Sequence, residues 1–153
     1  MSLKLPLKGS CLCGAVQVSV TAPPLLTLAC HCRDCQKLSA SAYTLTSMVP
    51  AENFSHTGDV IQGGRGSHDR VHFYCESCLS FVFSQISGAD HRINLRTSVL
   101  DQSASLQPFV ELMTNEKLPW VEVPAVHSFA EYPRSLEELQ SLMEEYAIWL
   151  STH

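Results

Sequence analysis

The stretch ACHCRDCQ, residues 29–36, holds three cysteines and one histidine within six consecutive positions. Four further cysteines stand in two close pairs, CLC at residues 11–13 and CESC at residues 75–78, so none of the seven is isolated. No segment has the apolar length of a signal peptide or a transmembrane helix, and we therefore expect a cytoplasmic protein. In a reducing cytosol, clustered cysteines hold a metal or do chemistry more often than they form structural disulfides. The grouping of the cysteines is thus the feature that decides the fold.

Length and composition limit what the chain can be. A chain of 153 residues is about one domain and can bury one core without covalent staples. With 45% hydrophobic and 16% charged residues, its composition is that of an ordinary globular protein. The formal net charge is −5, and no run of Lys and Arg could follow a phosphate backbone. We therefore expect neither nucleic acid nor a membrane as a partner.

The two separated cysteine pairs predict a structural zinc site. Structural zinc is held by four ligands in a tetrahedron, commonly supplied as two close pairs that the fold brings together. Cys11 and Cys13 would form one pair, and Cys75 and Cys78 the other. Such a site would fix the start of the domain to its middle.

The three central cysteines predict a second, open zinc site. In an extended segment, residues two apart point to the same face, so Cys30 and Cys32 can share an ion while His31 points away. A turn through residues 33–34 would bring Cys35 round as the third ligand and leave the fourth position free, as in catalytic zinc sites. We interpret His31 as a residue beside the ligands, or an exposed one, rather than as a ligand. The chain would then hold two zinc ions.

Other uses of the cysteines are compatible with the sequence. Buried free thiols are common small core residues, although close clustering argues against them. An exposed cluster without metal oxidises readily, which allows a disulfide between two of the three central cysteines. A thiol-redox protein would rely on such a disulfide, but we see no CxxC pair that opens a helix, and this disfavours it.

Alternating and β-branched residues predict a mainly β fold. The glycine-rich run at residues 63–67 is expected to be a mobile connection, because it lacks the Lys-Ser/Thr ending of a phosphate-binding loop. The predicted strands are residues 15–21, 25–30, 42–49, 70–75, 80–85, 91–98 and 106–113.

The chain ends in a predicted amphipathic helix. Ser135, with Glu138 three residues later, predicts a capping box. One face then carries apolar side chains, which we expect to pack on the sheet rather than to form a subunit contact. These are Leu136, Leu139, Met143, Tyr146 and Leu150. We therefore expect a zinc-binding β domain over residues 1–134 and a helix over residues 135–153, packed on the same domain.

Four motifs occur in a fixed order along the chain: GSCLCGAVQVSV (9–20), CHCRDCQKLSA (30–40), FYCESCLSFVF (73–83) and NEKLPW (115–120). In this order they resemble the glutathione-dependent formaldehyde-activating enzyme family, which includes the relatives of centromere protein V. The resemblance implies a β-tent fold, in which small antiparallel sheets surround a structural zinc. It also implies the division of ligands that the spacing predicts, with the two cysteine pairs on the structural zinc and the three central cysteines on a reactive one.

The chain departs from the family pattern at two positions. Family members usually carry Gly after the CxxC pair, where this chain has Leu79, and a left-handed turn there would cost a non-Gly residue about 1–2 kcal/mol. They also often carry Ser-Gly after the central cysteine group, where this chain has Ser39 and Ala40. We expect these departures to reshape the turn at Leu79 and the pocket wall near Ala40.

The resemblance implies a carbon–sulfur lyase. Three thiolates on a dication leave one net negative charge, so the second site would activate water poorly but could hold a substrate thiol as its thiolate. With glutathione and formaldehyde, attack of that thiolate gives S-(hydroxymethyl)glutathione, and the reverse reaction breaks the carbon–sulfur bond. Cys30, Cys32 and Cys35 are thus the predicted catalytic residues. The alternative is a non-catalytic zinc-binding interaction module of the same fold, and a homodimer is compatible with both.

Glutathione is anionic, so cationic side chains near the second site are its predicted binding residues. We assign this role to Arg33 and Lys37, which flank the cluster. More distant candidates are Arg65, His68, Arg70 and Lys117. Candidates for a general acid that protonates the new alkoxide are His31, Tyr43 and Ser41. Trp120 is expected in the core, the commoner place for an aromatic side chain.

Overall fold

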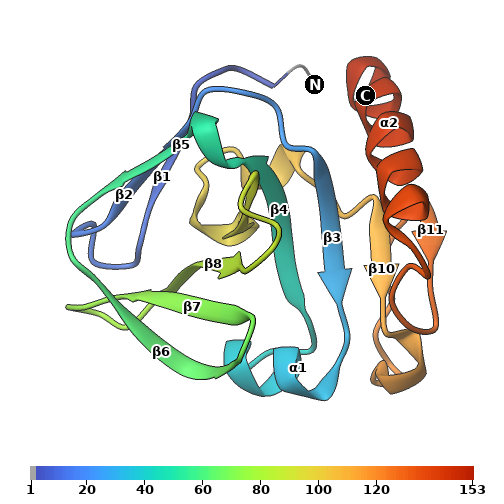
Figure 1. Ribbon diagram of the computed structural model, residues 1–153, viewed down its shortest axis with the longest axis horizontal. Helices are drawn as coiled ribbons and strands as arrows, with labels where there is room; N and C mark the ends of the chain where they lie inside the picture. Colours follow the sequence, from blue (N-terminus) through green and yellow to red (C-terminus); the bar gives the residue numbers. More distant parts are fainter. Residues whose placement is uncertain (1–2) are drawn as a thin grey trace.

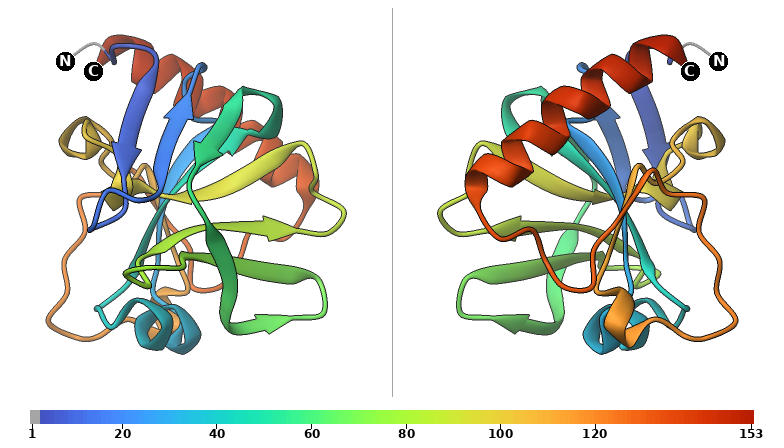
Figure 2. Two further views of the ribbon diagram at one scale, coloured as in Figure 1. Left: turned by 90° about the vertical axis from the view of Figure 1, so that its left-hand side faces the viewer. Right: turned by 90° about the vertical axis from the view of Figure 1, so that its right-hand side faces the viewer.

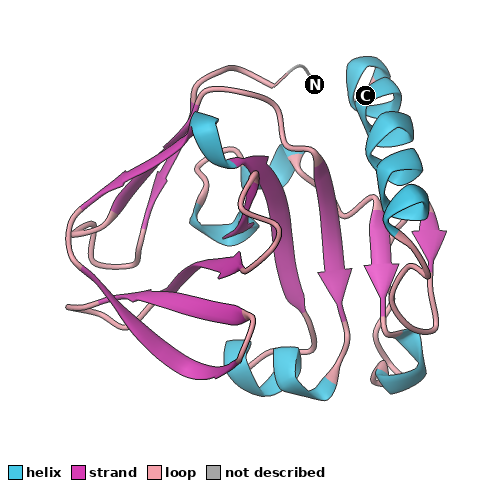
Figure 3. Ribbon diagram, in the orientation of Figure 1, coloured by secondary structure: helices cyan, strands magenta, loops and turns pink. Residues whose placement is uncertain are grey.

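The structure, a computed structural model, describes residues 3–153 and confirms the predicted mainly β fold (Figures 1 and 3). The strands are β1 (Leu7–Ser10), β2 (Gln17–Val20), β3 (Leu26–Cys30), β4 (Thr44–Pro50), β5 (Phe54–Thr57), β6 (Val60–Ser67), β7 (Arg70–Cys75), β8 (Phe81–Ile86), β9 (Arg92–Arg96), β10 (Val110–Leu112) and β11 (His127–Ser128). The α-helices are α1 (Arg33–Ser39) and α2 (Leu136–Thr152), and short 3-10 turns are η1 (Ala51–Asn53), η2 (Thr97–Val99), η3 (Ser103–Ser105) and η4 (Thr114–Glu116).

The strands form two sheets. The smaller sheet has the order β1-β2-β5, and the larger has the order β11-β10-β3-β4-β9-β8-β7-β6. Neighbouring strands are antiparallel, except that β10 runs parallel to both β3 and β11. These parallel pairs attach the last third of the chain to the edge formed by β3.

All seven predicted strands are present, although the one predicted at 106–113 shortens to β10. The prediction of a mobile connection at residues 63–67 is wrong, because this run belongs to β6 and pairs with β7 around an irregularity in register. Glycine is needed there for packing, since a Cβ at Gly63 or Gly64 would crowd the side chain of Tyr74. Glycine in a strand can thus indicate a close neighbour rather than a loop.

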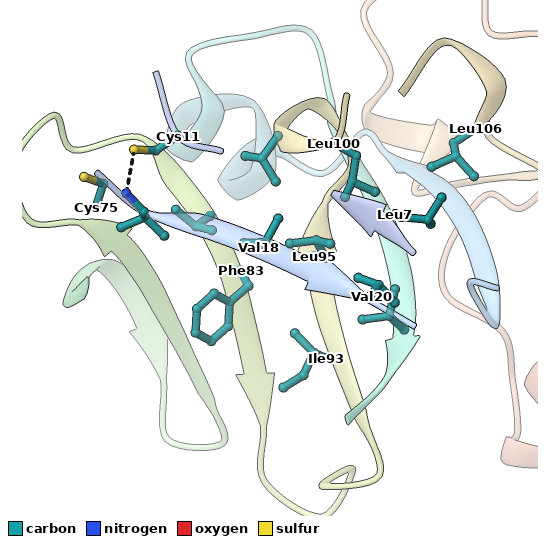
Figure 4. Close-up of a cluster of buried hydrophobic side chains, with 14 residues drawn as sticks. Leu7, Cys11, Val18, Val20, Cys75, Phe83, Ile93, Leu95, Leu100 and Leu106 are labelled. Carbon is teal, nitrogen blue, oxygen red and sulfur yellow. Dashed lines mark hydrogen bonds between the residues drawn. The ribbon is translucent and has the colours of Figure 1, made fainter. Parts of the chain in front are cut away.

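The first core lies between the two sheets and is drawn in Figure 4. The small sheet contributes Val18 and Val20, and the facing strands β8 and β9 contribute Phe83 and Leu95. Alternation explains this face, because residues two apart in a strand point to the same side. Burial of such aliphatic side chains is worth about 1.5–3 kcal/mol each and holds the sheets together.

The second core lies on the face of the large sheet that points away from the small sheet, where α2 covers β3 and β10. The two views in Figure 2 show α2 lying obliquely across the strands beside it. Leu142 and Tyr146 of α2 are buried with Leu26 and Val110. Leu136, which we predicted on the packing face, is 83% exposed, so that prediction is wrong. It occupies the first helical position, ahead of the part of α2 that enters the core.

The start of α2 is capped as the sequence predicts. The side chain of Ser135 accepts a hydrogen bond from the backbone N–H of Glu138 at 3.1 Å. The Glu138 carboxylate reaches back to the N–H of Arg134 at 2.7 Å, one residue before the usual capping-box partner. The division into residues 1–134 and 135–153 stays a prediction, but the helix shares its core with β3 and β10.

Two further points concern the surface. Trp120 is 73% exposed, so the prediction that it lies in the core is wrong; it follows η4 in a connection without regular structure. Within residues 3–153, neither helix has the length and apolar character needed to cross a bilayer.

Candidate metal centres and the cavity beside them

The first cluster consists of Cys11, Cys13, Cys75 and Cys78, and it joins the two sheets. Cys11 and Cys13 lie between β1 and β2, whereas Cys75 ends β7 and Cys78 precedes β8. All four Sγ atoms lie within 4.8 Å of one another. The Cys11–Cys13 and Cys13–Cys75 sulfurs are 3.6 and 3.8 Å apart, and Figure 4 shows the sulfurs of Cys11 and Cys75 on the same side. A tetrahedral zinc with bonds of ~2.3 Å needs sulfurs about 3.8 Å apart, so the set fits zinc.

Local backbone turns aim the sulfurs of the first cluster. The N–H of Val16 donates to Cys11 Sγ at 3.3 Å, and the N–H of Gly14, whose φ is 80°, donates to the Cys11 carbonyl. After the second pair, the N–H of Leu79 donates to the Cys75 carbonyl at 2.9 Å. Leu79 has a φ of 59°, so the left-handed turn is kept although the residue is not glycine. The expected reshaping of this turn is therefore wrong.

The cavity cluster consists of Cys30, Cys32 and Cys35 at the junction of β3 and α1. Their Sγ atoms also lie within 4.8 Å of one another, so they too can share one ion. Cys30 ends β3, and Cys32 caps α1 by accepting a hydrogen bond from the N–H of Cys35 at 3.4 Å. The predicted turn through residues 33–34 is thus the first turn of a helix. Consequently Cys32 and Cys35 do form a CxxC pair that opens a helix, and our reason for disfavouring redox chemistry is wrong.

The thiols of the cavity cluster have unequal pKa values. A hydrogen bond with Cys30 is the main cause that lowers the pKa of Cys35 to about 6, and the charge of Arg96 adds to it. The same hydrogen bond, with burial, raises the pKa of Cys30. One ligand is therefore ionised at neutral pH before any ion arrives, which favours metal capture because the thiolate is the ligand form.

His31 points away from this cluster into a buried polar network. It is fully buried, so the alternative that it is exposed is wrong. Its Nε2 lies 2.9 Å from the Glu111 carboxylate, which also accepts from Lys117 at 2.8 Å and from Ser128 at 2.6 Å. Burial lowers the pKa of His31, and hydrogen bonds keep the pKa of Glu111 low although burial opposes them. The network fixes the segment between Cys30 and Cys32 to β10.

A cavity of about 760 Å³ opens beside the three sulfurs of the cavity cluster. This volume is in the range of small-molecule sites. Its floor is one face of the large sheet, and all three cysteines line it. The first cluster does not line it. Its cationic lining residues are Arg65, Arg70, Arg92 and Arg96.

Three of these arginines have no anionic partner within the described residues, although Arg96 donates one hydrogen bond to the Asn94 carbonyl at 3.3 Å. The buried Nε atoms of Arg70, Arg92 and Arg96 have no hydrogen-bond partner, and no ion pair involving them occurs within residues 3–153. Arg96 stacks over Phe81 at 4.7 Å, and burial lowers its pKa to about 10, so it stays cationic at neutral pH. Charged guanidinium groups without an ion-pair partner are suited to bind a ligand that carries carboxylate groups.

The sequence candidates for anion binding divide between the cavity and the outer surface. Arg65 and Arg70 line the cavity, whereas His68 and Lys117 do not. Arg33 and Lys37 are exposed on α1 and do not line it either. Their role in substrate binding stays a prediction. Among the proposed general acids, none of His31, Tyr43 and Ser41 lines the cavity.

Sequence reasoning missed Arg92, Arg96 and Tyr132. The two arginines alternate with Ile93 and Leu95, a pattern typical of a strand with one face in water. The available signal was two arginines on one strand face with no acidic residue in that strand. Tyr132 lines the cavity from the segment before α2, and burial, together with the charges of the cavity cluster, raises its pKa.

Together these features define a class: a mainly β protein with two cysteine clusters, each placed to hold an ion such as zinc. The family model described as glutathione-dependent formaldehyde-activating enzyme matches residues 6–116, and the chain belongs to that family. No curated protein matches the chain. It is similar to a Rhodobacter sphaeroides protein of known crystal structure, with 17% identity and a TM-score of 0.49 over 61% of this chain and 87% of that chain.

Proposed function

We propose that the chain is a carbon–sulfur lyase that cleaves and re-forms a hydroxyalkyl thiol adduct such as S-(hydroxymethyl)glutathione. The observation that carries this proposal is the convergence of Cys30, Cys32 and Cys35 on one point at the wall of a cavity that also holds unpaired guanidinium groups. Family membership supports a glutathione-type thiol.

The reaction needs no oxidant or reductant. In the cleavage direction, the carbon–sulfur bond breaks and its electron pair stays on sulfur. The hydroxyl group loses its proton and its oxygen forms the carbonyl of the aldehyde, while the thiol is released after gaining one proton. The reverse direction joins the same atoms.

The residues of the chain have separate tasks in this scheme. A zinc ion held by the three cysteines would supply a position where the substrate sulfur is kept as a thiolate. Arg70, Arg92 and Arg96 would hold substrate carboxylates. Tyr132 lies beside the cluster and forms part of the cavity wall.

The decisive experiment measures exchange between glutathione plus formaldehyde and their adduct by NMR, with zinc-loaded protein. The expected result is faster exchange than in buffer, and loss of that acceleration in Cys32→Ser with the fold retained by circular dichroism. The matched control is Lys8→Gln, an exposed change on the small sheet outside the cavity. Exchange at the buffer rate with two zinc ions bound would favour the non-catalytic interaction module instead.

Redox chemistry is the second candidate, because Cys32 and Cys35 form a CxxC pair that opens α1. It requires a reversible disulfide in place of the second ion. Mass spectrometry after mild oxidation of the zinc-loaded protein tests it. A disulfide that forms quantitatively and is re-reduced without loss of fold would favour redox chemistry, whereas thiols that stay reduced while zinc is bound would favour the lyase.

A further inference from the structure

The cavity beside the cavity cluster has two chemically different ends. One row of paired residues crosses its floor, in which Arg96 of β9 faces Thr46, Thr46 faces Leu28, and Leu28 faces Val110 of β10. Neighbouring strands lie ~4.8 Å apart, so this row spans about 14 Å. Along it, the side chains change from a charged group to a hydroxyl group and then to aliphatic groups. Cys30 lies two residues beyond Leu28 on the same face of β3, so its sulfur stands nearer the aliphatic end, whereas Cys35 lies within the influence of the Arg96 charge.

The charged end of the cavity is suited to bind an anion. Arg70, Arg92 and Arg96 reach it from strands β7 and β9, and their buried Nε atoms have no partner within the described residues. Asp34 also lines the cavity, but it forms no ion pair with them. A guanidinium that is partly buried without a counter-ion is unfavourable, so a bound carboxylate would restore its interactions.

The aliphatic end is closed by the C-terminal helix. Leu136, Leu139 and Leu142 of α2 line it together with Val110 and Leu112, and Leu139 and Leu142 also pack in the second core. Leu136 is 83% exposed, so an apolar side chain is kept at the cavity mouth without a protein partner that buries it. These residues lie beyond residue 116, outside the part of the chain that the family model matches. A formaldehyde adduct, whose carbon carries two hydrogens beside the hydroxyl group and the sulfur, has no carbon substituent to contact this wall.

We propose that the cavity selects a thiol adduct with a carboxylate at the arginine end and an apolar substituent of several carbons at the leucine end. The released aldehyde is then larger and more apolar than formaldehyde. This inference rests on the proposed lyase function, and the same bonds break and form. Leu136 and Leu139 determine specificity through the substituent on the aldehyde carbon.

The first test uses S-hexylglutathione and S-methylglutathione, which are non-cleavable mimics of a long and a short adduct. Calorimetric titration of the zinc-loaded protein is expected to show at least about tenfold tighter binding of the hexyl compound, because its extra methylene groups lose contact with water. Leu136→Ser and Leu139→Ser should bring the ratio towards one. The matched control is Ile148→Ser, since Ile148 is 70% exposed on the same helix and does not line the cavity.

The second test uses octanoate and acetate, which contain no sulfur and are not substrates of a lyase. Octanoate should bind more tightly than acetate, Leu139→Ser should weaken octanoate alone, and Arg92→Gln should weaken both. Equal binding of the hexyl and methyl thioethers by a protein that cleaves S-(hydroxymethyl)glutathione would overturn this inference and leave the lyase intact. Octanoate bound no more tightly than acetate would also overturn it. Failure to cleave any adduct, short or long, would overturn the lyase and the inference with it.

Discussion

The first cluster and the cavity cluster both offer cysteine sulfur as the ligand atom, but they suit different roles. In the first cluster, Cys13 and Cys75 are 62 positions apart and meet only because two sheets pack together. In the cavity cluster, the three cysteines lie within six positions and converge at one strand–helix junction. Four sulfurs enclose an ion, whereas three leave one position free. The number of sulfurs and the groups beside them therefore decide what a cysteine cluster can do.

The surroundings of the two clusters also differ. Cys11 and Cys75 are buried in the first core, whereas Cys13 is exposed and Cys78 is partly buried, and none of the four lines the cavity of about 760 Å³. Cys32 and Cys35 are only partly buried, and they face both a cavity and unpaired arginines. An ion at the first cluster would therefore support the fold, and one at the cavity cluster would be open to a ligand.

Removing one sulfur from each cluster should have the largest and the most unequal effect. Cys75→Ser should lower the free energy of unfolding by more than about 4 kcal/mol, since zinc binding and folding are coupled in such sites. Cys32→Ser should lose one zinc ion and keep the fold. Elemental analysis and thermal unfolding measure both effects. If Cys32→Ser unfolds the chain while Cys75→Ser does not, the two roles are reversed.

Metal removal should distinguish the clusters without mutation. Three ligands hold an ion less tightly than four, and they leave one coordination position at which a chelator can bind. Stepwise addition of a chelator is expected to release one zinc ion early with an unchanged circular dichroism spectrum, and the second only together with unfolding. Colorimetric zinc release monitored beside the spectrum checks this order. Release of both ions in a single step would contradict the expected difference between three and four ligands.

Charge removal in the cavity should have a smaller effect, on ligand affinity alone. Arg92→Gln should weaken binding of glutathione by about 10–100-fold, the range for one charged hydrogen-bonded contact. Arg33→Gln and Lys37→Gln are the matched surface variants, and calorimetry compares the three. A loss confined to the surface variants would return substrate binding to α1.

The smallest expected effects concern Leu79, directly after the first cluster, and Ala40, at the end of the helix that carries Cys35. Leu79 and Ala40 have φ values of 59° and 48°, in the left-handed region where glycine is favoured. Both are exposed, so Leu79→Gly and Ala40→Gly remove little packing and should each raise the free energy of unfolding by about 0.5–1 kcal/mol. Chemical denaturation measures this. As a control, Ser41→Gly, next to the turn, should not stabilise the chain.

Much of the fold and of the candidate metal centres could be predicted from local pattern. Alternation placed the seven strands, and Ser135 with Glu138 placed the start of α2. The spacing of the cysteines predicted the same two groups whose sulfurs the structure brings together. Such predictions succeed because period and spacing depend on neighbours along the chain.

The cavity was not predictable in the same way. Arg92 and Arg96 have the pattern of a solvent-facing strand, and only the pairing of β9 with β4 and β8 places them near the cysteines. Likewise, the CxxC pair was not recognised because the helix that it opens is only seven residues long.

Local sequence pattern is enough to predict a mainly β chain, a division of its cysteines into two sets of ligands, and a C-terminal amphipathic helix. Which cationic groups face the cavity cluster, and that α2 supplies an apolar part of the cavity wall, depend on the packing of distant elements. The physical reason is that spacing is set by local backbone geometry, whereas a cavity is set by which distant strands pair and which helix covers them.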